Sequence, residues 1–168
     1  MMRLGFGLDT GFMRDAIEFR SHVPKSQRAA LEALVFFNSC QERYAACIAE
    51  AVERFGTPEI VADGDRLRVR VTGLSDVQCL FAVERKSSRP VGVAVYMRAD
   101  LEHVTVVHLG VAPEYASGGP KAGEQLLLRL LREVRRSSRR MKGVRHVELF
   151  YIKERSASHR WRDVKALV

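Results

Sequence analysis

The clearest chemical signal is a run of small residues in the C-terminal half of the chain. HLGVAPEYASGGPKAGEQLLLRLLREVRR, residues 108–136, passes from an apolar run through a glycine-rich loop into an arginine-studded helical pattern. A helix start leaves up to four N–H groups without partners and carries the positive end of the helix dipole. Gly118, Gly119 and Gly123 would let an anion approach such amides closely. The segment predicts a phosphate-binding loop, with a plain strand-to-helix turn as the alternative.

Other reactive residues form no recognisable constellation. The glycine loop matches neither GxxxxGK[ST] nor GxGxxG, which excludes the P-loop and dinucleotide-binding motifs. The three cysteines, Cys40, Cys47 and Cys79, are odd in number and form no CxxC pair, so the sequence indicates neither a disulfide framework nor a zinc site. Neither a Ser/His/Asp nor a Cys/His arrangement is legible. We expect no metal.

The elements that must hold the loop follow from hydrophobic periodicity. Residues 26–55 lack Gly and Pro and repeat apolar residues at three- and four-residue steps, which predicts two helices with a break near Asn38 and Ser39. A stripe of Leu126, Leu127, Leu130, Leu131, Val134 and Met141 predicts a helix after the loop, ended by Gly143. Strands are predicted at residues 17–21, 67–71, 79–84, 91–97, 103–111 and 144–152.

The predicted order of elements defines an α/β fold. Residues 79–84 and 91–97 form an antiparallel hairpin, and residues 103–111 lie at the centre of the sheet. Strand, helix and strand over 103–152 then form a right-handed parallel β-α-β crossover. We therefore expect a mixed central sheet with flanking helices.

Length and charge limit the classes of function. The 168 residues suit one domain spanning 1–168. Residues 116–168 hold 14 Lys and Arg against 5 Asp and Glu, so the net charge of +8 belongs to the C-terminal third, where it would attract an anionic ligand, a cofactor or nucleic acid. No signal peptide or apolar run of 18 residues occurs, so we expect a cytoplasmic protein with no membrane association.

Leu109, Val111, Pro113 and Tyr115, followed by the glycine loop and a leucine-rich helix, resemble the cofactor motif of the GNAT superfamily of acetyl-CoA-dependent N-acyltransferases. The order of elements agrees over residues 78–152. The resemblance implies a GNAT-like fold in which backbone groups of Leu109 and Val111 bind the pantetheine arm. It also implies that loop amides bind the pyrophosphate of the acetyl-CoA cosubstrate. The loop positions concerned are Gly118, Gly119, Lys121, Ala122, Gly123 and Glu124.

Two departures from the family pattern lie in this loop. Ala116 and Ser117 stand where the family has Gln or Arg, and the loop is two residues longer. We expect Lys121 to supply the missing charge.

The family transfers acetyl to an amine by direct attack, which requires a base and an acid. Relatives place Glu or His near the motif strand, which makes Glu102, His103 and His108 the candidate bases. Strand alternation places His103 and His108 on opposite faces unless a bulge intervenes. Tyr151 is the candidate acid because the family's tyrosine, in a helix after the splayed strand, has no counterpart here.

The resemblance predicts an N-acetyltransferase acting on an unidentified primary amine. One alternative is an inactive GNAT-like module that binds nucleic acid or a ribosomal partner through its basic C-terminal third. Another is an interaction protein whose short C-terminus is exchanged in a homodimer.

Overall fold

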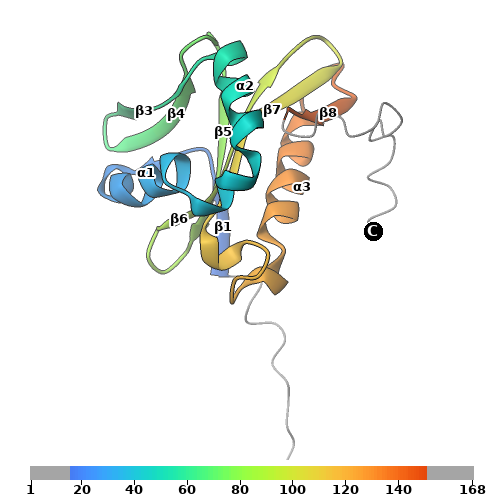
Figure 1. The fold of residues 1–168 in the computed structure, drawn as a ribbon. Helices are drawn as coiled ribbons and strands as arrows, with labels where there is room; N and C mark the ends of the chain where they lie inside the picture. The colour runs from blue at the N-terminus through green and yellow to red at the C-terminus, as the bar shows by residue number, and fades with distance from the viewer. Residues whose placement is uncertain (1–15, 151–168) are drawn as a thin grey trace, which may run out of the picture.

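The computed structural model describes residues 16–150, with the backbone alone at positions 40, 43 and 44. A five-stranded mixed sheet in the order β1-β5-β6-β7-β8 forms its centre (Figure 1). The pairs β1 with β5, β5 with β6 and β6 with β7 are antiparallel, and β7 with β8 is parallel. Its strands are β1 (Ile17–Arg20), β5 (Gln78–Glu84), β6 (Pro90–Arg98), β7 (His103–Val111) and β8 (His146–Leu149).

The mixed α/β sheet agrees with the sequence prediction, because the predicted hairpin and crossover both occur. The strands β5, β6 and β7 lie close to the predicted ranges. Valine is frequent in β6 and β7 because a β-branched side chain packs well on a pleated surface, and most of these valines are fully buried. The apolar character of β6 and β7 on both faces follows from the helices that cover them.

Helices cover both faces of this sheet. Gly92 of β6 has no room for a Cβ because Leu130 of α3 (Leu126–Ser138) lies against it. Gly110 of β7 faces α1 (Arg28–Phe36), whose Leu34 carbonyl lies 3.5 Å from where a Cβ would be. Because Gly110 pairs with Val93, the neighbour of Gly92, the two glycines point to opposite faces. Thus α3 packs on one face, and α1 packs on the other.

The predicted helical pair is confirmed, including its break. A 3-10 segment, η3 (Ser39–Tyr44), separates α1 from α2 (Ala45–Phe55). Gly56 follows α2 with a φ of +96°, a left-handed conformation that ends a helix and favours glycine. The 3-10 segment η2 (Lys25–Gln27) precedes α1.

The sequence prediction was wrong in two places. Leu127 of α3 is 40% exposed, whereas Leu126, Leu130, Val134 and Ser138 form the buried stripe at four-residue steps. The helix ends at Ser138 rather than at Gly143, and a turn joins it to β8. A small second sheet in the order β2-β4-β3 was only partly predicted. Its strands are β2 (Val23–Pro24), β4 (Arg66–Val71) and β3 (Pro58–Asp63). The half-buried strand β3 was missed because its apolar residues do not alternate with polar ones.

Candidate functional site

The edge of β7 is open along its C-terminal half. β8 pairs with β7 only from His103 to Val106, and Phe150 donates its N–H to the Val106 carbonyl as the last contact of this ladder. Within residues 16–150, no strand continues along β7 beyond that point. The sheet therefore offers an unpaired strand edge where β7 approaches the glycine loop.

Leu109 and Val111 direct their backbone groups toward this open edge. The N–H of Ala112 donates to Val91 in β6, and successive residues of a strand point their polar groups to alternate sides. Leu109 and Val111 therefore face away from β6. The Val111 carbonyl already accepts a hydrogen bond from the buried Asn38 side chain, which comes from the segment between α1 and α2.

A bulge in β7 determines which way His108 points. Val95 pairs with His108, and the next residue of β6, Tyr96, pairs with Val106, so Val107 is an extra residue in β7. Thr105 pairs with Met97, which lies two residues from Val95 and on the same face. Thr105 and His108 consequently share the face that α1 and α2 cover, and so does His103.

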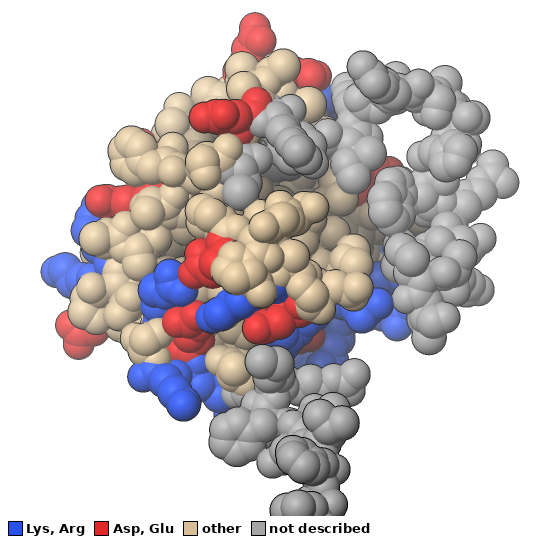
Figure 2. Space-filling model, turned by 60° about the horizontal axis from the view of Figure 1, so that its bottom comes forward, with Lys and Arg blue, Asp and Glu red and all other residues tan. Residues whose placement is uncertain are grey.

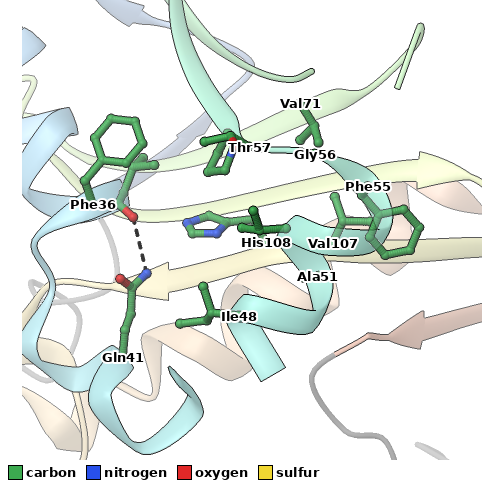
Figure 3. Close-up of a pocket in the computed structure, with 13 residues that line it drawn as sticks. Phe36, Gln41, Ile48, Ala51, Phe55, Gly56, Thr57, Val71, Val107 and His108 are labelled. Atoms are coloured by element: carbon green, nitrogen blue, oxygen red, sulfur yellow. Dashed lines mark hydrogen bonds between the residues drawn. The ribbon is translucent and has the colours of Figure 1, made fainter. Parts of the chain in front are cut away.

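His108 lies in a pocket between this face and the helical pair (Figure 3). The pocket has a volume of about 200 Å³ and is mainly apolar. Gln41 crosses one end and donates from Nε2 to the Val35 carbonyl. Burial lowers the pKa of His108 to about 4, so its imidazole is neutral at pH 7. The lining residues are Val35, Phe36, Gln41, Ile48, Ala51, Val52, Phe55, Gly56, Thr57, Pro58, Val71, Val107 and His108.

Glu102 and His103 lie elsewhere, at the opposite end of β7. His103 is five positions before His108, and because Val107 is an extra residue the two lie four paired steps apart, about 13 Å along the strand. Its Nδ1 lies 2.8 Å from Asp100 Oδ1, and this hydrogen bond raises the pKa of His103. The Glu102 carboxylate is 3.7 Å from Arg145 Nε. The structure therefore does not bring these two candidates together with His108.

A second feature of this end is a pair of imidazoles. The His103 ring stacks on that of His146 in β8, with ring centroids 5.0 Å apart.

Tyr151, the candidate acid, lies outside the described residues. Across residues 16–150, no group of three or more His, Cys, Asp or Glu side chains is arranged to hold a metal ion.

The glycine loop uses most of its predicted amides internally. The N–H groups of Gly119, Lys121, Ala122 and Glu124 donate to carbonyls of the same loop. A Cβ on Gly119 would lie 2.5 Å from the carbonyls of both Pro113 and Glu114, so this position requires glycine. The loop is thus a tightly bonded turn around a close backbone approach.

The start of α3 retains the character predicted for an anion site. Gln125 precedes it in a left-handed conformation and provides no side-chain cap. The first intrahelical bond runs from Arg129 N–H to the Gln125 carbonyl, which leaves the amides of Leu126, Leu127 and Leu128 without an acceptor in the helix. Gly118 and Gly123 border open space, because a Cβ on either would meet no atom within 4 Å.

Lys121 is already engaged by side chains beneath the loop. Its Nζ lies 3.5 Å from Glu84 Oε1 and 3.3 Å from the Tyr115 hydroxyl. Arg89 joins Glu84 to Glu114, so acidic and basic groups alternate at this end of the molecule (Figure 2). The hydrogen bond from Arg89 is the main reason that the pKa of Glu84 falls to about 2. A carboxylate therefore balances the charge of Lys121.

Sequence reasoning missed Asn38, Glu84 and Arg89. No local pattern connects Asn38 with Val111, because 73 residues separate them. Glu84 and Arg89 flank the predicted hairpin turn, and their opposite charges five positions apart are a signal that could have indicated an ion pair across it.

No protein family, curated protein or solved structure matches the chain in any of the three comparisons. Among the helices of residues 16–150, none has the length and apolar character needed to cross a membrane.

Proposed function

We propose that the protein is a GNAT-like N-acetyltransferase that transfers the acetyl group of acetyl-CoA to a primary amine. The observation that carries the proposal is the β7 edge that β8 leaves unpaired beyond Val106, beside the uncapped start of α3. An unpaired strand edge can take an extended pantetheine arm as an added strand, and a helix start favours the pyrophosphate.

The donor would be held mainly by backbone groups. Leu109 and Val111 would bind the pantetheine arm, and the Val111 carbonyl would exchange its bond with Asn38 for one with the donor. The pyrophosphate would meet the amides of Gly123 and the first turn of α3, with Gly118 leaving room for its approach. In this arrangement Lys121 contributes less than the sequence predicts, because Glu84 offsets its charge.

The acetyl transfer requires one new bond and two proton movements. The amine nitrogen bonds to the thioester carbonyl carbon, the carbon–sulfur bond breaks, the nitrogen loses a proton and the departing thiolate gains one. His108 is the favoured base among the three candidates because it lines a pocket and is neutral at pH 7. Its low pKa suits removal of a proton from the acidic tetrahedral intermediate rather than from the free ammonium.

Isothermal titration calorimetry with acetyl-CoA tests the proposal. Saturable binding near one site per chain is expected at near-physiological salt. Gly123→Asp places a negative charge beside the predicted pyrophosphate site and should weaken binding at least about tenfold. Ser75→Asp adds the same charge at an exposed position before β5 and serves as the control. Absence of binding to the folded wild-type protein would overturn the proposal.

The second candidate function is nucleic-acid binding through the outer face of α3. Arg132, Arg136, Arg139 and Arg140 are exposed along this helix and the turn after it, and Arg136 lies 3.6 Å from Glu133. Phosphate contacts of this kind weaken steeply as salt rises. A binding constant for a short RNA duplex that falls linearly with salt on a logarithmic scale, without acetyl-CoA binding, would favour this function instead.

A further inference from the structure

The pocket around His108 lies next to the residues of β7 that are proposed to bind the pantetheine arm, on the side away from the proposed pyrophosphate site. Its floor is formed by Val107 and His108, and Leu109 is the next residue along β7. Successive strand residues rise about 3.3 Å, so the pocket floor at His108 lies about 3 Å along the strand from Leu109 and about 10 Å from Val111. A group attached to the thioester carbon would reach the pocket before it reached solvent.

The chemistry of the pocket selects an uncharged group. Its walls come from apolar side chains of α1 and α2, including Ile48 and Ala51, and no Asp or Glu occurs among its lining residues in the described part of the chain. An ammonium ion buried there would lose its hydration without gaining a carboxylate partner. The same cost of burying a positive charge keeps the His108 imidazole neutral. A charged amine is therefore not the group that fills the pocket, and the apolar end of the donor suits it better.

The volume of the His108 pocket is larger than an acetyl group would fill. A cavity of about 150 Å³ with apolar walls can hold benzene, which has six carbon atoms. At about 200 Å³, this pocket accommodates roughly six to eight carbon atoms on the same scale. An acetyl group has two carbon atoms and would leave most of the volume unused.

We propose that the His108 pocket binds the acyl chain of the donor, and that the preferred donor is an acyl-CoA of about four to eight carbons rather than acetyl-CoA. This inference rests on the proposed transfer of an acyl group from CoA to an amine, and it replaces the acetyl group of that proposal with a longer acyl chain. The reaction keeps the same balance: the amine nitrogen bonds to the acyl carbon, the carbon–sulfur bond breaks, and one proton passes from nitrogen to the thiolate.

The test is calorimetric titration of the full chain with CoA, acetyl-CoA, butanoyl-CoA, hexanoyl-CoA and dodecanoyl-CoA. Each buried methylene group should tighten binding by up to about fourfold. Affinity should therefore rise from acetyl-CoA to hexanoyl-CoA and then level off, because a longer chain exceeds the pocket. A continued rise to dodecanoyl-CoA would indicate adsorption to an open surface and would overturn the proposal.

Two substitutions at Ile48 should move the preference in opposite directions. Ile48→Phe fills the pocket and should lower the ratio of hexanoyl-CoA to acetyl-CoA affinity at least about tenfold. Ile48→Ala enlarges it and should shift the best chain length upward. Leu101→Phe is the control, because it introduces a phenylalanine at an aliphatic side chain that is 77% exposed and does not line the pocket. It should leave the affinity ratio unaltered.

The outcomes separate the two proposals. Equal affinities for acetyl-CoA and hexanoyl-CoA would overturn the acyl pocket and leave the acyltransferase function standing. Failure of every CoA species to bind would overturn both. Unchanged ratios in both Ile48 variants would show that the chain binds elsewhere, which also overturns the pocket.

Discussion

His108 should make the protein lose stability as the pH falls. Its side chain is 5% exposed, and burial lowers its pKa from about 6.5 to about 4. Between these two values the unfolded chain binds a proton that the folded chain does not bind. Since the free energy of unfolding rises with pH wherever the unfolded state binds more protons, the folded state weakens as the pH falls from 6.5 to 4.

The size of this effect follows from the pKa difference. Each unit corresponds to about 1.4 kcal/mol, so the full effect is about 3 kcal/mol, of which about 2 kcal/mol should appear between pH 7 and pH 4.5. Glu84 contributes little in this window, because its pKa is lowered to about 2 and its stabilisation is lost mainly below pH 4.5. The hydrogen-bonded His103 has a raised pKa and acts in the opposite direction.

Urea denaturation of the wild-type protein and of His108→Gln at several pH values isolates this contribution. The other titrating groups are common to both proteins, so the difference between their free energies of unfolding should shrink by about 2 kcal/mol from pH 7 to pH 4.5. His22→Gln is the control, because burial also lowers the pKa of His22 but leaves that side chain partly exposed. The difference in free energy of unfolding between the wild-type protein and His22→Gln should change less between pH 7 and pH 4.5. A constant difference for His108→Gln across this range would refute the reasoning.

Two pairs of substitutions, one in the glycine loop and one in α3, compare a tightly packed position with an open or exposed one. Gly119→Ala forces a Cβ to within 2.5 Å of two carbonyls and should lower the free energy of unfolding by about 1–3 kcal/mol, whereas Gly123→Ala enters open space and should leave it unchanged or raise it by up to about 1 kcal/mol. Leu130→Ala removes a fully buried side chain and should cost about 2–5 kcal/mol, whereas Leu127→Ala, at a 40% exposed position, should cost less than 1 kcal/mol. Thermal and urea unfolding measure both comparisons, and equal effects within either pair would contradict it.

The sheet could be predicted from the sequence because its signal is local. The strands β5, β6 and β7 are apolar runs bounded by polar turns, and valine is frequent in β6 and β7. The strand β4 alternates arginine with an apolar residue. The strand β3 was missed because a six-residue segment with half-buried side chains carries no such alternation. Leu127 was assigned to the core because its apolar character satisfies a helical stripe, although only the four-residue series from Leu126 meets the sheet.

The site was less predictable because its geometry depends on contacts between distant segments. The glycines were predicted to let an anion approach the loop, whereas Gly119 instead permits a close approach of the loop to its own carbonyls. The sequence could not reveal that the loop would use its own carbonyls as partners for four of its amides, nor that Glu84 would engage Lys121 from across the sheet. Each of these contacts satisfies a polar group that the local pattern leaves open.

The bulge at Val107 is the feature on which both proposals depend. In a regular strand, His108 would lie on the opposite face from Thr105, and its imidazole would point toward α3, where Leu126 and Leu130 are fully buried. The extra residue turns His108 to the face covered by α1 and α2, where a pocket remains between the helices. It lies where β8 stops pairing with β7, so the same few residues open the strand edge and orient the candidate base. A β-bulge is thus the physical reason that the pocket proposed for the acyl chain lies beside the unpaired edge of β7.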